Sequence, residues 1–230
     1  MSWLRRAQEE PPPAAVPPPP PAGVELAEHP APGLKSALAA LPHPGASILD
    51  LGPALAANVD FFCRLGARLR IADLAAAFEE GAPPATPARW RELLPELLPF
   101  EADERFDLVL AWDLANYAGR ERWPVVAAHL TPCLAAGGSI HLLVQVEKEM
   151  PAFPARYRIV EPGTISEERR THARIATPRF SHAEIEKLHP GLVAPRSFLG
   201  RHGVQEFLLE PAAAHNLPPR AVAKPRVRTR

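Results

Sequence analysis

The 230-residue sequence has few cysteines, no long apolar run and no leader-like start. Its two cysteines, Cys63 and Cys133, have no short spacing between them, which excludes a disulfide framework and a cysteine-rich zinc site. We expect both to be buried free thiols. Residues 1–10 are charged and do not resemble a signal peptide, and no apolar stretch approaches the ~20 residues that cross a bilayer. By elimination, we expect a cytoplasmic protein without a membrane segment.

A net charge of one sign is also missing, because 26 basic residues balance 26 acidic ones. Charge therefore indicates neither a nucleic acid nor an anionic membrane as partner. The nine histidines show no metal-ligand spacing, so we expect no metal. His182 and His189, seven residues apart on one expected helix, are predicted to lie at the surface. Hydrophobic residues make up 47% of a chain long enough for one domain, so a core can form.

Proline is abundant instead, and ten of the 30 prolines fall in the first 33 residues. The runs at 11–13 and 17–21 cannot join a helix or an internal strand, because proline lacks an amide hydrogen. We predict a disordered proline-rich segment over residues 1–33, acting as a spacer rather than as a ligand for a proline-binding module. At the other end, residues 212–230 carry five basic and no acidic residues. They predict a solvated, disordered basic tail, and the alternative is a tail that contacts RNA, DNA or an acidic protein.

Between these ends, short buried-type segments alternate with segments of helical periodicity. Strands are predicted at 47–51, 68–72, 106–112, 140–146, 193–199 and 204–209, and helices at 33–41, 58–65, 86–98, 123–136 and 181–188. This alternation predicts one α/β domain over residues 34–211, with a doubly wound, mostly parallel sheet of about seven strands and helices on both faces. The link between the last two strands is so short that they must be antiparallel neighbours.

Ligands of doubly wound sheets bind beyond the carboxyl ends of the strands, so the turn after strand 47–51 matters most. Residues 48–56 read ILDLGPALA, an acidic residue and then a turn that contains glycine. This segment resembles the first motif of the class I (Rossmann-like) S-adenosylmethionine-dependent methyltransferase family. Gly52 matches the first glycine of that motif, whereas the small residues Ala54 and Ala56 replace the next two. The resemblance implies cofactor contacts by Asp50, Gly52, Pro53 and Ala54.

An acid stands directly after the next expected strand. Asp73 follows Gly52 by 21 residues, where the family carries the carboxylate that binds the ribose hydroxyls. The resemblance therefore implies that Asp73 binds ribose. The alternative is that Asp73 caps a helix N-terminus, a common task for aspartate.

Two further segments resemble the family in order and spacing. Residues 106–113, FDLVLAWD, resemble its fourth strand, and residues 130–138, LTPCLAAGG, resemble the helix, tight turn and fifth strand that follow. The resemblance implies that Trp112 borders the cofactor. It also places Asp113 where a general base could take a proton from the attacking atom. The alternative is that Asp113 caps the next loop.

Asn116 and Tyr117 stand just beyond this strand and are candidates for positioning the substrate, although Tyr117 could equally pack in the core. Residues 150–178 interrupt the alternation and are rich in arginine, as expected for a substrate-side insertion. The same insertion contains Glu161, Glu167 and Glu168, which favours a mutually neutralised surface loop.

The sequence also departs from the family. Residues 93–99 offer no clear third strand and no clean equivalent of the acid that meets the adenine amine. The paired prolines typical of amino-methylating nucleic-acid enzymes are missing after Asp113, so nucleic acid is not expected as the methyl acceptor. The hypothesis is an S-adenosylmethionine-dependent methyltransferase acting on a small molecule or a protein. One alternative is a non-catalytic binding or scaffold protein that keeps the fold. A nicotinamide-dependent oxidoreductase is weaker, because the turn after Asp50 fails the dinucleotide glycine pattern.

Overall fold

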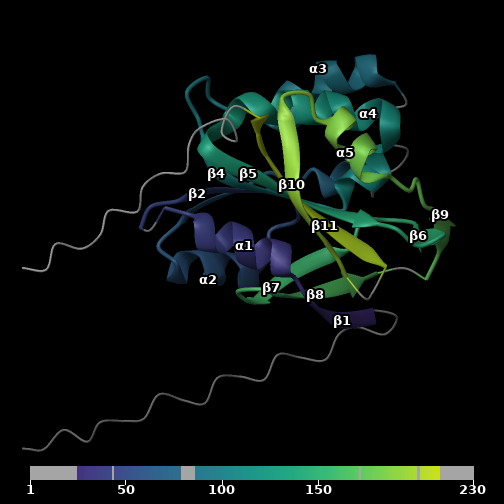
Figure 1. Ribbon diagram of the computed structural model, residues 1–230, viewed down its shortest axis with the longest axis horizontal. Coiled ribbons are helices and arrows are strands. Elements are labelled where there is room, and N and C mark those ends of the chain that lie inside the picture. The colour runs from purple at the N-terminus through teal and green to yellow at the C-terminus, as the bar shows by residue number, and fades with distance from the viewer. Residues whose placement is uncertain (1–24, 43, 79–85, 171, 201–202, 213–230) are drawn as a thin grey trace, which may run out of the picture.

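A six-stranded mixed sheet forms the centre of the computed structural model, which describes residues 25–42, 44–78, 86–170, 172–200 and 203–212 (Figure 1). In spatial order its strands are β10 (Leu192–Leu199), β11 (Val204–Pro211), β5 (Leu134–Gln145), β4 (Phe106–Trp112), β2 (Ser47–Asp50) and β3 (Arg68–Ile71). The pairs β3–β2, β2–β4 and β4–β5 are parallel, and β11 runs antiparallel to both of its neighbours. The predicted fold class and the antiparallel final strand are confirmed.

Helices cover both faces of this sheet. The helices α1 (Pro32–Ala40) and α2 (Ala56–Arg64) lie on one face, and α3 (Pro87–Leu97), α4 (Leu114–Leu130) and α5 (His182–Leu188) lie on the other (Figure 1). Each face has its own hydrophobic core, because β2, β4 and β5 direct alternate apolar side chains to opposite sides. Such a sheet, buried on both sides, explains why its strands are almost continuously apolar in sequence.

The sheet has one strand fewer than the expected seven. Between β3 and β4 the described residues form a short 3-10 helix, η1 (Ala75–Phe78), and then α3. Thr86 caps α3, with its side chain accepting the amide of Arg89, and Pro87 occupies the first turn. The helix expected at 86–98 is thus confirmed, and the missing third strand agrees with the lack of a strand pattern there.

The expected boundaries around α4 and β5 are wrong. The helix begins at Leu114 rather than at 123, and it bends at Gly119, whose φ of 69° breaks the helical backbone. It is followed by a 3-10 turn, η2 (Thr131–Cys133), and β5 already starts at Leu134. Gly137, at a φ of 82°, lies where the pairing of β4 with β5 shifts register, so the glycines predicted to end a helix lie within a strand.

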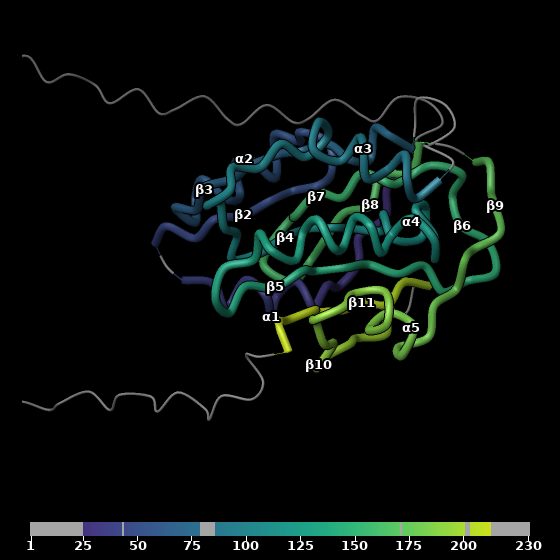
Figure 2. Tube along the Cα trace, turned by 90° about the horizontal axis from the view of Figure 1, so that it is seen from above, coloured from purple at the N-terminus to yellow at the C-terminus, as the bar shows by residue number. Residues whose placement is uncertain are grey.

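Two small sheets lie outside the central one. One has the order β1 (Glu25–Pro30), β8 (Thr164–Arg169), β7 (Arg156–Glu161), and the other pairs β6 (Glu149–Pro151) with β9 (Arg174–Ala176). The pair β6–β9 lies at one end of the molecule in both views (Figures 1 and 2). The insertion at 150–178 is therefore largely built of paired strands rather than of a loop.

Strand β1 corrects the expected domain boundary. Residues 25–30 pair with β8 as an edge strand, and Pro32 begins α1, so residues 25–33 belong to the folded domain and are not disordered. Proline is tolerated there because an edge strand and a first helical turn need no amide hydrogen from it. The predictions for residues 1–24 and for 213–230 lie outside the described residues.

The two cysteines were expected to be buried, and His189 was expected to lie at the surface. Cys133 is buried as expected, but Cys63 is exposed on α2. His189 is fully buried rather than at the surface, because its ring lies between α5 and Trp123. Within the described residues, no helix combines the length and the apolar character that a membrane crossing requires.

Candidate functional site

Asp50 ends β2 at the carboxyl edge of the sheet and is buried, with 1% of its surface exposed. One carboxylate oxygen accepts the amide of Gly52 at 2.9 Å and the indole Nε1 of Trp112 at 2.6 Å. The other accepts Nδ2 of Asn58 at 3.2 Å. Burial raises the pKa of Asp50, and these three donors oppose that rise. The carboxylate is thus committed to groups of its own chain.

Trp112 lies directly over Gly52. A Cβ placed on Gly52 would come within 2.9 Å of Nε1 and 3.1 Å of Cδ1 of Trp112, so only glycine fits beneath the indole. The ring of Tyr157 stacks on the indole at a centroid distance of 5.2 Å and an interplanar angle of 14°. Trp112 is 3% exposed, and the space above the glycine turn is therefore filled by a side chain.

The backbone of Trp112 explains how its ring reaches that position. Trp112 is the one non-glycine residue with a positive φ, 46°, in the part of the chain that the structure describes. The pairing of β4 with β5 shifts register between Leu110 and Trp112, just before the strand ends. A left-handed conformation at a bulky residue is unfavourable, and it persists where surrounding contacts fix it. Here the bond to Asp50 and the stack on Tyr157 supply those contacts.

Asp73 follows β3 and remains exposed. Its carboxylate accepts the amide of Ala76 at 3.1 Å, so it caps η1 as the alternative interpretation predicted. Asp73 also lies near enough to Asp50 to contribute to the raised pKa of that buried acid. Ala54 is exposed as well, and Pro53 is half-buried, so the outer side of the turn is open to solvent. A ribose-binding role for Asp73 stays a prediction.

Asp113, the candidate general base, has no exposed surface. Its Oδ2 accepts the hydroxyl of Tyr157 at 3.0 Å and Nε2 of Gln145 at 3.4 Å, whereas Oδ1 has no hydrogen-bond partner among the described residues. Burial, and after it the charge of Glu167, raises the pKa of Asp113 to about 7. Asp113 is therefore a buried acid that titrates near neutral pH, and it makes no cap of the following helix.

Asn116 and Tyr117 bond to the backbone of neighbouring segments. Asn116 exchanges two hydrogen bonds with the main chain of Gln145, at 2.9 and 3.2 Å. The hydroxyl of Tyr117 donates to the carbonyls of Pro151 and Phe153, at 3.0 and 2.8 Å. These bonds fix α4 to the end of β5 and to the inserted segment. Tyr117 packs in the core, as the alternative interpretation predicted. Substrate positioning by Asn116 or by Tyr117 stays a prediction.

Asn58 is a residue that sequence reasoning missed. Besides its bond to Asp50, its Nδ2 donates to the carbonyl of Tyr157 at 3.0 Å, and its Oδ1 accepts the amide of Ile159 at 2.9 Å. Asn58 therefore fixes strand β7 against the start of α2, beside the glycine turn. The available signal was its position four residues before the buried Phe62, which puts an amide on the apolar face of that helix.

The charged residues of the insertion pair with one another across β7 and β8. Glu167, 1% exposed, receives Nε and Nη2 of Arg169 at 2.8 and 2.9 Å and also bonds to His29 at 3.0 Å. Glu168 is buried too and forms an ion pair with Arg158. The acidic and basic side chains of the insertion neutralise one another as expected. They lie on strands rather than in a loop, however, and some of them are buried.

No protein-family model and no curated protein matches the chain. Solved structures do match it. A 1,6-didemethyltoxoflavin-N1-methyltransferase from Burkholderia thailandensis is 16% identical, with 78% of this chain and 75% of that chain covered and a TM-score of 0.41. A TehB-like SAM-dependent methyltransferase from Corynebacterium glutamicum is 11% identical, with coverages of 78% and 86% and a TM-score of 0.43. The glycopeptide N-methyltransferase MtfA is 13% identical, with coverages of 78% and 90% and a TM-score of 0.41.

All three of these neighbours are methyltransferases by name. Their low identities and low TM-scores do not assign an activity to this chain.

Proposed function

We propose that this chain is a non-catalytic binding protein with a methyltransferase-like fold, in which its own Trp112 fills the place of the methyl donor. The observation that carries the proposal is the indole over Gly52, hydrogen-bonded to Asp50 at 2.6 Å. A ligand that approached the glycine turn closely would displace a buried ring and remove a donor from a buried carboxylate. The loss of such a donor costs about 1–3 kcal/mol.

The residues expected to carry chemistry support the same proposal. A general base must lie within hydrogen-bond reach of the proton that it takes, about 3 Å, and Asp113 is fully buried beneath Tyr157. Asn116 and Tyr117 use their polar atoms to hold backbone segments together. These side chains stabilise the domain rather than present groups to a methyl acceptor.

A second candidate function is methyl transfer from S-adenosylmethionine to a small molecule or a protein. It is favoured by the exposed carboxylate of Asp73 at the end of β3, beside the open outer side of the turn at Ala54. In this candidate the indole of Trp112 leaves Gly52 when the cofactor binds, and Asp73 receives the ribose hydroxyls.

Calorimetric titration of the full chain with S-adenosylmethionine and S-adenosylhomocysteine separates the two candidates. The proposal expects no saturable binding of either compound up to about 1 mM. The methyltransferase candidate expects binding that Asp73→Ala weakens by about tenfold or more. Asp60→Ala, which removes an exposed carboxylate in the middle of α2, is the matched control. Micromolar binding that is lost in Asp73→Ala but kept in Asp60→Ala would replace the first candidate by the second.

A further inference from the structure

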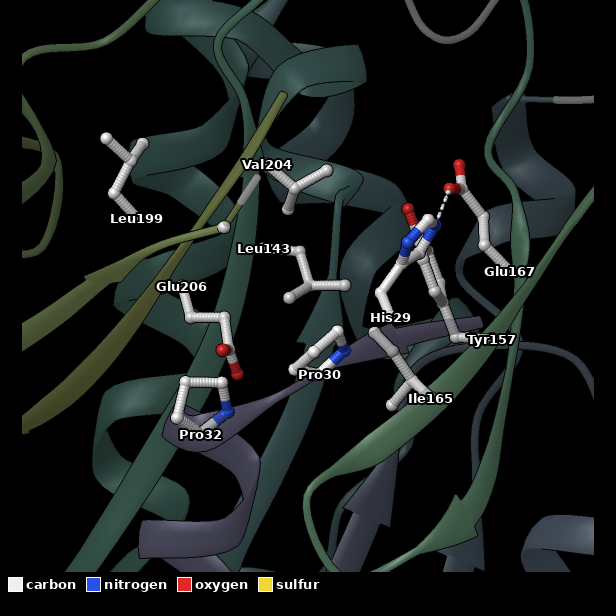
Figure 3. Close-up of a pocket in the computed structure, with 11 residues that line it drawn as sticks. His29, Pro30, Pro32, Leu143, Tyr157, Ile165, Glu167, Leu199, Val204 and Glu206 are labelled. Atoms are coloured by element: carbon white, nitrogen blue, oxygen red, sulfur yellow. Dashed lines mark hydrogen bonds and ion pairs between the residues drawn. The ribbon is translucent and has the colours of Figure 1, made fainter. Parts of the chain in front are cut away.

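A cavity of about 210 Å³ lies between the small sheet β1–β8–β7 and strands β5 and β11 of the central sheet (Figure 3). Its apolar walls come from Pro30, Pro32, Leu143, Ile165 and Val204. Leu199, which also lines it, is 75% exposed, so the cavity reaches solvent beside the end of β10. Pockets for drug-sized ligands span about 300–1,000 Å³. This cavity therefore fits a smaller ligand with an apolar body.

Four polar side chains also face the cavity, and three of them are matched within the protein. Glu167 has the guanidinium of Arg169 as its counter-charge, and His29 is bonded to Glu167 (Figure 3). The hydroxyl of Tyr157 is donated to Asp113. The fourth, Glu206, lies at the opposite side of the cavity, next to Pro32, in the same view.

Glu206 is a buried acid without a cationic arginine or lysine partner among the described residues. It is 5% exposed, and its Oε2 accepts the amide of Leu34 at 3.0 Å and Nε2 of His141 at 2.8 Å. Its Oε1 accepts no hydrogen bond from the described part of the chain. A buried carboxylate with one oxygen unused is costly unless something pairs with it.

His141 is poorly placed to supply the missing charge. Its Nε2 must carry a hydrogen to bond to Glu206, and Nδ1 is buried with no partner among the described residues. A second proton on Nδ1 would therefore be a buried donor without an acceptor among the described residues, which is unfavourable. Among the described residues, His141 is thus the one basic side chain bonded to Glu206, and it reaches only Oε2.

We propose that this cavity binds a small organic ammonium ion. Its cationic nitrogen pairs with Oε1 of Glu206, and its apolar group packs against Leu143, Ile165 and Val204. Charge-assisted hydrogen bonds to a buried carboxylate are the strong ones, and they give selectivity for a cation over a neutral isostere. The cavity lining includes neither Gly52 nor Trp112, but Tyr157 lines the cavity and also stacks on Trp112, so amine binding and methyl-donor binding are measured in separate titrations.

The test uses three probes of similar shape, titrated into the full chain at pH 7 and followed by calorimetry. Benzylamine carries the cation, benzyl alcohol is neutral, and benzoate is an anion. We expect benzylamine to bind more tightly than benzyl alcohol by about tenfold or more, and benzoate not to bind. Equal affinity for the amine and the alcohol, or no binding of benzylamine, would overturn the proposal.

Three variants then locate the site. Glu206→Gln keeps an oxygen for Leu34 and His141 but removes the charge, and we expect it to weaken benzylamine binding by about tenfold or more without weakening benzyl alcohol. Glu210→Gln, on the same strand but outside the cavity lining, is the matched control and should bind like the unchanged protein. Val204→Phe fills the cavity without altering Glu206, and it should abolish binding.

The cavity-filling variant also keeps the proposal open to refutation if Glu206→Gln does not fold. Benzylamine binding that survives Val204→Phe would place the amine elsewhere and refute the site. Titration with S-adenosylhomocysteine is read separately, so failure of the amine site and failure of the proposed function give different results.

Discussion

The indole Nε1 of Trp112 donates a 2.6 Å hydrogen bond to Oδ1 of Asp50, joining the ends of β4 and β2 across the carboxyl edge of the sheet. Both residues were expected to contact a cofactor, and in the structure they are hydrogen-bonded to each other. The bond places the indole over Gly52 and against Tyr157. The same three positions that resemble a cofactor site therefore form a packed internal contact.

Trp112→Phe should destabilise the domain by about 1–3 kcal/mol, because the ring stack is kept while a buried carboxylate loses its shortest hydrogen bond. Urea unfolding followed by circular dichroism measures the change. In an Asp50→Asn background the same substitution should cost less, since the two changes act on one interaction. Equal costs in both backgrounds would show that the bond contributes nothing.

Gly52→Ala should cost about 1–3 kcal/mol, because the added Cβ meets the indole and overpacks a filled site. The comparison is Ala54→Ser in the same turn, which is exposed and should change the free energy of unfolding by no more than about 0.5 kcal/mol. In a Trp112→Ala background the cost of Gly52→Ala should largely disappear. A cost that persists there would trace the need for glycine to the backbone instead.

Asp113 should make the domain less stable as the pH rises from about 4 to about 7. The pKa of Asp113 is raised from 3.8 to about 7, first by burial and then by Glu167, so the native state holds this proton over a range in which the unfolded chain has released it. Relative to Asp113→Asn, the unchanged protein should lose stability across that range, by at most about 4 kcal/mol. Urea unfolding at several pH values measures the difference.

Two further variants check this assignment. Tyr157→Phe removes a hydrogen bond that lowers the pKa of Asp113, so the loss of stability should extend to higher pH. Asp60→Asn removes an exposed acid and is the matched control. A pH dependence removed equally by Asp60→Asn and by Asp113→Asn would contradict the role given to the buried acid.

His189 should act in the opposite direction over an overlapping range. Burial lowers its pKa from 6.5 to about 4, so stability is lost as the pH falls through that interval, when the unfolded chain binds the proton and the native state does not. Its Nε2 accepts the indole N–H of Trp123 at 2.7 Å, which requires the unprotonated nitrogen. Relative to His189→Gln, the unchanged protein should lose up to about 3 kcal/mol between pH 7 and pH 4.

The matched control for His189 is His182→Gln, which removes an exposed histidine from the other end of α5. Measuring both variants at each pH separates the contribution of His189 from that of Asp113. If His182→Gln abolished the acid-induced loss as fully as His189→Gln, the buried ring would not be its source.

The strands and most helices were predictable because their residues carry a local signal. Apolar runs such as that of β4 and the prolines and glycines around them fix the type of element without reference to the rest of the chain. Boundaries failed where a tertiary contact decided them. Gly137 resembles a helix stop in sequence, yet it lies within β5 because pairing with β4 continues past it. Strand β1 has little local signal, and it forms because β8 offers it an edge.

The places of the candidate site residues in the fold could be predicted from the sequence, but the contacts between those residues could not. Asp50, Gly52 and Trp112 were assigned to one edge of the sheet, because the carboxyl ends of parallel strands meet there. Their mutual contact was not predictable, since it depends on the left-handed φ of Trp112 and on Tyr157 from the insertion. No sequence pattern indicates a role for Glu206, because that role arises only from the cavity that segments far apart in the chain enclose.

By itself, the sequence determined the fold class and the place where parallel strands end in polar residues, since periodicity and chain breakers act over a few neighbouring residues. Only the tertiary structure decided that an indole lies over Gly52, that Asp113 and His189 are sealed from water, and that Glu206 faces a cavity. These outcomes depend on burial and on partners more than 40 residues away in the chain, as in the bond from Trp112 to Asp50. Desolvation is a property of the packed molecule, so no local pattern encodes it.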